Sequence, residues 1–564
     1  MLPELMIFLG YPMNRSYIFI IILICFLLNP IYSNPIQFVE VTESAGIHFK
    51  NSSGNAEKRF IIETQSAGVS FADLNGNGQL DVFFTNGISS NFNDKYSGTA
   101  LYKNAGNGTF VNRTDQSNAR ILGWTMGMAI ADYDSDGDRD LYVTRWGKDV
   151  MLNNNGGGNF KETTEKAGLG SALWGIGAAF ADYDRDGDLD LFVAYYIDFE
   201  KNGPPFFDKT CKHNGINSAC GPLGAKPQPN LLYKNNGKGY FTEIGHTNSL
   251  TERNYYSMGV AWLDYNNDGY QDIYVANDGH PNSLFENNGK FFVNHALVQS
   301  VAYSGNGRPQ AGMGIAVGDY NNDGLFDLFV TNFSQDHNTL YANSGKGYFS
   351  DVSGKTGLAS SSRPFMGWGT FFFDADKDGW EDLFIANGHL MPEIDKAGVS
   401  LKYRQRNQFY HNNSKGKFVD ISEELGQALQ LERVSRGAAF GDYDNDGDLD
   451  VLVANLDSQP SLLRNETRSS NHWLSIYLRS NGLNTDAIGA KIKVTDGVTS
   501  QIREVRTGTS FQAQNDIRQF FGLGKSSKVD IEIKWPNGKK NSFEDVEVDR
   551  FLTINQENLS INTE

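Results

Sequence analysis

A nine-residue acidic pattern, D-x-[DN]-x-[DN]-G-x-x-D, occurs seven times along the chain. Positions 1, 3, 5 and 9 carry carboxylate or amide oxygens, and position 6 is glycine in every copy. The candidate metal ligands, copy by copy, are Asp73, Asn75, Asn77 and Asp81; Asp132, Asp134, Asp136 and Asp140; Asp182, Asp184, Asp186 and Asp190; Asp264, Asn266, Asp268 and Asp272; Asp319, Asn321, Asp323 and Asp327; Asp374, Asp376, Asp378 and Asp382; Asp442, Asp444, Asp446 and Asp450.

Oxygen ligands at this spacing favour calcium, a hard cation that takes six to eight oxygens. Positions 1, 3 and 5 present alternate side chains inward, glycine permits a sharp turn, position 7 lends a carbonyl and position 9 closes the sphere. Magnesium demands a tighter octahedron, and transition metals favour His or Cys. We therefore predict about seven Ca²⁺ ions, one per loop. The first loop, with Asn75 and Asn77, has the fewest carboxylates and should bind most weakly.

The charge of the chain agrees with this prediction. The formal net charge is −18, and many acidic residues are gathered in the seven loops, where they repel one another unless a cation separates them. An acidic chain argues against a nucleic-acid-binding surface, which needs basic patches.

The elements that hold these loops are short strands. Each loop lies between two apolar segments, and the next element, such as Leu101–Phe110, has an Asn/Gly-rich tetrapeptide typical of a β-hairpin. Four strands per repeat are the content of one propeller blade. We predict an all-β fold, a seven-bladed β-propeller over residues 34–467 followed by a small antiparallel β domain over 468–558.

The N-terminal segment Phe38–Thr42 reads as a strand with no hairpin partner, whereas the last repeat lacks a fourth strand. We expect this segment to complete the seventh blade and close the ring without an open sheet edge. An open array of hairpins is the alternative.

The spacing between the third and fourth loops is 82 residues, against 50 to 68 elsewhere, because an insertion lies at about 197–228. It contains Cys211 and Cys220, which we expect to form a disulfide worth about 2–3 kcal/mol. Two free buried thiols are the alternative.

Residues 1–33 predict an export signal. Asn14 and Arg15 precede an apolar run from Tyr17 to Leu28, which is followed by Asn29-Pro30 and a small-residue exit at Ser33. The run is shorter than the roughly 20 residues of a membrane-spanning helix, which favours a cleaved signal. An uncleaved anchor is the alternative. We expect a secreted protein, or one in the periplasm or on the outer surface if the source is bacterial.

The loops and the strand before each of them resemble FG-GAP (VCBS-type) repeats, as in the propellers of integrin α chains. The C-terminal motifs resemble the ASPIC/UnbV domain of the cartilage acidic protein family: Asn471–Leu474, Ile488–Ala490, Arg503–Val505, Phe521–Gly524 and Trp535–Gly538. The segment Asn484–Asp486 departs from the Asn-Arg-Asp expected there. The resemblance implies secretion and calcium binding, and no defined reaction.

No catalytic constellation is evident: the 9 His form no H-E-x-x-H spacing, and no nucleophile elbow or Walker motif occurs. We expect a protein that binds an extracellular protein or glycan, for example in adhesion. The alternatives are a polysaccharide-active enzyme or its accessory module, and a structural envelope component.

Three aromatic residues, Trp124, Trp174 and Tyr256, each precede a repeated glycine by three positions. They are candidates for the rim of a ligand-binding mouth, because flat aromatic rings stack well at interfaces. Ordinary packing between blades is the alternative.

Overall fold

The computed structural model describes residues 36–89, 97–200, 211–213, 215–245, 250, 254–557 and, for the backbone, 561–563. The expected export signal lies outside these residues. Within them, no helix has the length and apolar character needed to cross a membrane. Residues from Ile36 onward form one compact unit, to which everything below refers.

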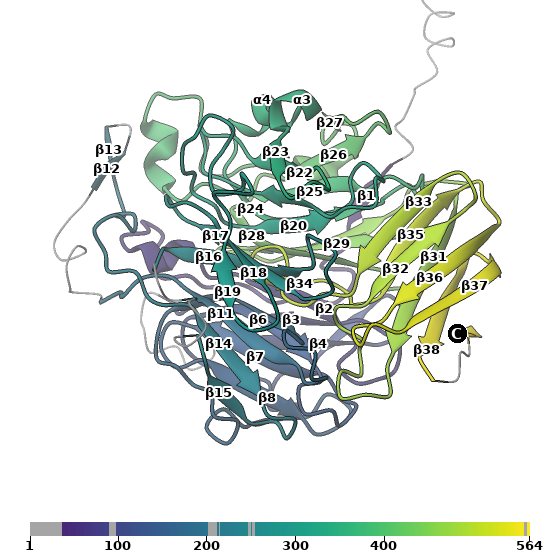
Figure 1. The fold of residues 1–564 in the computed structure, drawn as a ribbon. Coiled ribbons are helices and arrows are strands. Elements are labelled where there is room, and N and C mark those ends of the chain that lie inside the picture. Colours follow the sequence, from purple (N-terminus) through teal and green to yellow (C-terminus); the bar gives the residue numbers. More distant parts are fainter. Residues whose placement is uncertain are drawn as a thin grey trace, which may run out of the picture. The chain divides into compact units, whose positions relative to one another are not determined.

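The repeats form four-stranded antiparallel sheets, seven of them among the described residues and one for each acidic loop (Figure 1). We call them blades 1 to 7 after their loops. Their strands are β2 (Val69–Ala72), β3 (Asp81–Phe84), β4 (Ala100–Asn104), β5 (Phe110–Asn112); β6 (Thr125–Ala131), β7 (Asp140–Arg145), β8 (Val150–Asn154), β9 (Phe160–Glu162); β10 (Gly175–Ala181), β11 (Asp190–Tyr195), β14 (Leu231–Asn235), β15 (Phe241–Glu243); β16 (Ser257–Leu263), β17 (Asp272–Asn277), β18 (Ser283–Asn287), β19 (Phe292–Asn294); β20 (Ile315–Gly318), β21 (Asp327–Val330), β22 (Thr339–Asn343), β23 (Phe349–Asp351); β24 (Gly367–Phe373), β25 (Asp382–Asn387), β26 (Gln408–Asn412), β27 (Phe418–Asp420); β28 (Ser435–Gly441), β29 (Asp450–Asn455), β30 (Ser461–Asn465) and β1 (Phe38–Glu40). The predicted all-β propeller is confirmed.

The ring closes through the N-terminal strand, as the sequence suggests. Strand β1 pairs antiparallel with β30, with Phe38 opposite Asn465. A second bond repeats around the ring: the asparagine that ends each third strand donates its Nδ2 to a loop carbonyl of the preceding blade. Asn235 bonds Tyr133 at 2.8 Å, and Asn104 of blade 1 bonds Tyr443 of blade 7, also at 2.8 Å. The open array of hairpins is therefore excluded.

The first strand of each blade is almost entirely buried, which explains why apolar residues and glycine predominate in it. All seven residues of β6, Thr-Met-Gly-Met-Ala-Ile-Ala, are buried. Gly127 in this strand has no room for a side chain, since a Cβ there would lie 2.5 Å from the carbonyl oxygen of Ile176 in the next blade. Small residues thus let neighbouring blades approach closely.

The insertion carries a two-stranded hairpin of β12 (Cys211–His213) and β13 (Ile216–Ser218). A disulfide joins Cys211 to Cys220, with their Cα atoms 4.9 Å apart, so the predicted bridge is confirmed. Residues 201–210 and 214 of the insertion lie outside the described residues. A disulfide fits an oxidising, extracellular-type compartment.

The short helical segments of the described chain are η1 (Ile61–Thr64), α3 (Ser353–Thr356), α4 (Leu358–Ser362), η2 (Pro392–Lys396) and η3 (Gln427–Gln430).

The C-terminal domain is a sandwich of two four-stranded sheets, the yellow strands of Figure 1. One sheet has the order β35 (Gln519–Gly524), β31 (His472–Arg479), β38 (Arg550–Asn555), β39 (Ile561–Thr563); the other has β33 (Ser500–Glu504), β32 (Lys491–Thr495), β36 (Lys528–Lys534), β37 (Lys540–Glu547). Their apolar faces share one core. The expected antiparallel arrangement is wrong at one place: β31 and β38 run parallel, because the chain visits the other sheet before it returns.

A loop of this domain enters the ring. We call residues 506–515 the plug segment; it includes the short strand β34 (Ala513–Gln514), which pairs in parallel with β2 of blade 1. In blade 3, the Phe180 N–H donates to Thr507 Oγ1 at 2.7 Å, and that hydroxyl donates back to the Phe180 carbonyl at 2.9 Å. Ser510 exchanges both backbone hydrogen bonds with Ile315 of blade 5, at 2.9 and 3.1 Å.

The plug segment also contacts blades 6 and 7. The Thr370 N–H donates to Ser510 Oγ at 2.9 Å, and this hydroxyl donates to the Ala438 carbonyl at 2.8 Å. The Phe511 ring packs against Trp368, with centroids 5.0 Å apart. First strands from five blades therefore hold one segment of the C-terminal domain on the axis of the ring.

Candidate metal centres

The backbone of each loop is folded by its own first aspartate. In loop 2, Asp132 Oδ1 accepts the Asp136 N–H and Oδ2 accepts the Gly137 N–H, both at 3.0 Å. Gly137 has φ of 97°, a left-handed conformation that favours glycine. Position 4 is left-handed as well, with Ser135 at 62°. This turn directs the side chains of positions 1, 3 and 5 toward a common centre.

The aspartate at position 9 has a structural role in addition to the predicted one. Asp140 is fully buried; its Oδ1 accepts the Asn154 N–H at 2.7 Å, and its Oδ2 accepts the Tyr133 N–H at 3.2 Å. It thus fastens the loop to the third strand. The corresponding bond to the third-strand asparagine occurs at Asp81, Asp190, Asp272, Asp327, Asp382 and Asp450.

The third-strand asparagines are the site residues that sequence reasoning missed. Each one anchors the ninth aspartate of its own loop through its backbone and the neighbouring blade through its side chain. The available signal was the asparagine that ends the Leu-Tyr-x-Asn element of the repeats. These residues are Asn104, Asn154, Asn235, Asn287, Asn343, Asn412 and Asn465.

The predicted ligands of four loops come together as groups of carboxylates. In each group, one oxygen per residue lies within 4.8 Å of the others: Asp132, Asp134 and Asp136; Asp182, Asp184 and Asp190; Asp374, Asp376 and Asp382; Asp442, Asp444 and Asp450. Loops 1, 4 and 5 combine aspartates with asparagines. In loop 4, the Asn266 Nδ2 donates to Asp268 Oδ2 at 3.0 Å, and the Asn266 Oδ1 accepts the Asp268 N–H at 3.0 Å.

The electrostatics of the loops reflect crowded acids. Burial, followed by the neighbouring charge of Asp186, raises the pKa of Asp182 to about 7. Burial raises the pKa of Asp442 to about 8, although the Arg518 guanidinium opposes the shift. Burial also raises the pKa of Asp140 well above its usual range. The loops therefore lack positive charge in proportion to the carboxylates they gather.

Unpaired oxygens provide a test of whether the loops suit a cation. Asp182 Oδ1, Asp264 Oδ1 and Asp327 Oδ2 have no hydrogen-bond partner within the described part of the chain, and their side chains are 7%, 2% and 0% exposed. A buried carboxylate oxygen without a partner is costly. An oxygen-ligated divalent cation would satisfy it, so the residues present fit such an ion.

The residue before each third-strand asparagine faces the loop in several blades; we call it the flanking position. In blade 2, Asn153 donates to Asp134 Oδ2 at 2.8 Å. In blade 3, the Lys234 ammonium contacts Asp184 and lies 3.1 Å from Asp186 Oδ2. One position of the repeat thus places different chemistry beside otherwise similar loops.

The C-terminal domain docks on the acidic loops, a contact that the sequence did not indicate. Thr485 donates to Asp132 Oδ2 of loop 2 at 2.7 Å, and Lys491 Nζ donates to Asp264 Oδ2 of loop 4 at 2.9 Å. The Trp473 indole lies against Gly447 of loop 7, where a Cβ would approach it to 2.2 Å. The candidate metal centres therefore lie in the interface between the ring and the C-terminal domain.

The expected aromatic rim is wrong. Trp124, Trp174 and Tyr256 are 2%, 0% and 6% exposed and belong to one buried cluster, so ordinary packing explains them. The insertion covers two of these rings: Phe199 packs on Trp174, with ring centroids 5.5 Å apart, and the Tyr256 hydroxyl donates to the Ala225 carbonyl at 3.0 Å.

Several solved structures are similar to this chain. Among solved structures, the Dos1 propeller aligns with 76% of this chain and 95% of its own, at 9% identity and a TM-score of 0.38. A lectin from Agrocybe aegerita, described as recognising non-reducing terminal N-acetylglucosamine, aligns with 63% of this chain and 79% of its own, at 17% identity and a TM-score of 0.36.

Sequence relatives are more informative. Cartilage acidic protein 1 is homologous: the Mus musculus and Homo sapiens proteins are each 29% identical over 278 residues, 48% of this chain, and the Xenopus tropicalis protein is 27% identical over 293 residues, 50% of this chain. The matched segment spans 40%, 39% and 42% of these relatives, about two-fifths of their length.

Family models cover most of the chain. The FG-GAP-like repeat model matches residues 73–143, 132–193, 223–275, 264–330, 319–385 and 397–453. The model named ASPIC and UnbV matches residues 480–561. The chain therefore belongs to the family of FG-GAP-like repeat proteins and carries a C-terminal ASPIC and UnbV domain.

Proposed function

We propose that this protein is a calcium-loaded propeller that binds a protein or glycan ligand outside the cell or at its surface. The observation that carries the calcium assignment is the set of unpaired buried oxygens on Asp182, Asp264 and Asp327, each in a loop that offers oxygen ligands. Calcium accepts six to eight such ligands, and the carbonyl at position 7 adds one more. With one ion per loop, about seven Ca²⁺ ions would be held.

Bound calcium would also support the contact between the two domains. The loops lie beneath the C-terminal domain, which approaches them with Thr485 and Lys491. Without cations, the crowded carboxylates repel one another and the loop geometry loosens. Ions that bind only the ordered loops would stabilise both the ring and the C-terminal domain docked on it.

The position that we propose for the ligand rests on strand order. Acidic loops join first to second strands, at the end of the ring where the C-terminal domain docks. The disulfide hairpin follows a second strand, β11, and so lies at the other end. Recognition loops on a rigid scaffold are frequent binding sites. We place the ligand at this free end, beside the insertion, and assign no catalysis because the loop carboxylates are committed to cations.

Three observations support the proposed location outside the cell. Residues 1–33 have the pattern of an export signal, Cys211 and Cys220 form a disulfide, and the homologous proteins are named for cartilage. Disulfides persist in oxidising compartments.

The test is a calcium count joined to a binding screen. Tag-free protein dialysed against CaCl₂ should retain about seven Ca²⁺ ions per chain, measured by elemental mass spectrometry. The Asp264→Asn variant should retain fewer Ca²⁺ ions per chain. On a glycan array and a surface-protein extract, ligand retention should occur with calcium and disappear with chelator. Retention of no calcium would refute the metal assignment, and shortening of a polysaccharide in the same wells would favour an enzyme.

A further inference from the structure

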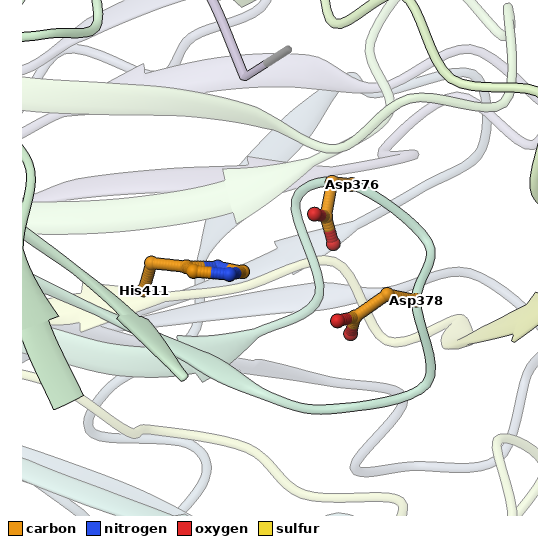
Figure 2. A group of neighbouring side chains, drawn as sticks. All are labelled: Asp376, Asp378 and His411. Carbon is orange, nitrogen blue, oxygen red and sulfur yellow. The ribbon is translucent and has the colours of Figure 1, made fainter. Parts of the chain in front are cut away.

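Loop 6 differs from the other loops because an imidazole joins its carboxylates. His411 occupies the flanking position at the end of β26, immediately before Asn412. Figure 2 shows its ring directed at the loop, toward the carboxylates of Asp376 and Asp378. One ligand atom from each of these three residues lies within 4.8 Å of the other two, and all three side chains are half-buried.

The flanking position carries no other imidazole. Its residues in blades 1 to 7 are Lys103, Asn153, Lys234, Glu286, Ala342, His411 and Arg464. Lys234 already places an ammonium between its loop carboxylates. Glu286 is engaged elsewhere, since its Oε2 lies 2.8 Å from His295 Nδ1. Among the described residues, several groups of side chains could bind a metal ion, and the group of Asp376, Asp378 and His411 is the only one of them that contains a nitrogen ligand.

The ring of His411 is held by a second carboxylate. His411 Nδ1 lies 3.0 Å from Asp382 Oδ1, and Asp382 is 1% exposed and anchored by the Asn412 N–H at 2.9 Å. A carboxylate on one ring nitrogen is the usual means of orienting an imidazole whose other nitrogen binds a metal. Nε2 is the nitrogen left for that purpose.

A free oxygen lies in the same place. The Asp376 Oδ1 atom is buried and lacks a hydrogen-bond partner within the described residues. The backbone carbonyl of Asp376 accepts from Asn471 Nδ2 of the C-terminal domain at 3.0 Å. A cation bound here would therefore lie next to a contact between loop 6 and that domain.

We propose that loop 6 binds a divalent transition metal ion, zinc in the first instance, through Asp376, Asp378 and His411. Imidazole nitrogen with carboxylate oxygen suits zinc, whereas calcium selects oxygen ligands throughout. Zinc would take the place of the calcium ion proposed for loop 6, and this assignment does not require calcium in the other six loops. The chain would then carry two classes of metal site, separated by one side chain on the third strand.

The experiment uses the full chain without a histidine tag, saturated with millimolar Ca²⁺ and titrated with Zn²⁺. Wild type should retain one equivalent of Zn²⁺ in calcium excess, and His411→Ala should bind it on the order of 10- to 100-fold more weakly. His48→Ala, which removes an exposed histidine, should leave Zn²⁺ retention unchanged. Asn153→His, which transfers the imidazole to the flanking position of loop 2, beside Asp134 and Asp136, should add a second equivalent.

Two results would overturn the proposal: no Zn²⁺ retained by wild type in calcium excess, or equal retention by wild type and His411→Ala. If His411→Ala fails to fold, His411→Gln provides the same comparison, and the gain in Asn153→His tests the principle separately. Calcium is counted in every sample. Zinc without calcium would refute the calcium array and keep this site, and calcium without zinc would do the reverse.

Discussion

The ion pair between Arg139 and Asp486 connects the ring to the C-terminal domain, and its removal should open that interface. Arg139 stands at position 8 of loop 2 and holds Asp486 through two hydrogen bonds of 2.8 and 3.0 Å. The side chains are 14% and 3% exposed. Burial by itself would raise the pKa of Asp486, but the Arg139 guanidinium holds it below its ordinary value. The pair is thus ionised and shielded from water.

Asp486→Asn would leave the guanidinium buried without a counter-charge. Breaking one side of a buried pair costs about 3–5 kcal/mol. Because about 1.4 kcal/mol corresponds to a tenfold change in an equilibrium, the open state of the interface should become on the order of 100-fold more populated or greater. The same Arg139 also donates to the Asp73 carbonyl at 3.2 Å, so loop 1 should loosen with it.

The assay is hydrogen–deuterium exchange of the plug segment, whose Ser510 N–H bonds the Ile315 carbonyl. Exchange of its protected amides should accelerate by about two orders of magnitude in Asp486→Asn. Glu57→Gln, which removes an exposed pair with Arg59, should leave exchange unchanged. Arg139→Leu combined with Asp486→Leu should restore much of the protection, because no charge stays buried. A less than threefold effect of Asp486→Asn would refute the reasoning.

Three further predictions concern metals, the disulfide and the plug. Chelation should lower the melting temperature, because ions that bind only the folded state stabilise it. The chelated protein should also lose stability as pH rises from about 4 to 8. Burial raises the folded pKa of Asp182 to about 7 and that of Asp442 to about 8, so ionising these carboxyls opposes folding, and calcium should remove this dependence. A flat pH profile in chelator would contradict this. Cys211→Ser with Cys220→Ser should cost about 2–3 kcal/mol in urea unfolding, and no loss would refute the value. Gly508→Ala should expel the plug segment, since its φ is 57° and a Cβ would lie 1.9 Å from the Ala178 carbonyl oxygen; proteolysis should then release the C-terminal domain, whereas unchanged resistance would contradict the packing.

The docked domain gives the acidic loops a structural role in addition to the proposed binding of ions. Polar groups of the C-terminal domain reach loops 2 and 4, and the Trp473 ring rests on Gly447 of loop 7. If the loops bind cations as proposed, a change in their occupancy would alter the surface on which the domain rests. Metal binding and domain docking should therefore be measured together.

Local spacing was enough to determine the repeat from the sequence. The acidic pattern, the flanking apolar segments and the hairpin signals each depend on residues within about ten positions of one another. They identify the strands, the loops and the candidate ligands. The unpartnered segment at Phe38 and the short Cys211–Cys220 separation extended this reasoning to the closure of the ring and to the disulfide.

The tertiary structure decided what lies beside the loops. The contact of Thr485 with Asp132 and the entry of the plug segment join residues hundreds of positions apart, and no periodicity records such pairs. The burial of Trp174 by Phe199 joins residues only 25 positions apart, but it too follows no spacing of the repeat. Proximity between distant segments arises from packing of complementary surfaces, which spacing along the chain does not encode. For that reason the sequence located the oxygen ligands, whereas the structure alone placed the His411 imidazole among them and the C-terminal domain above them.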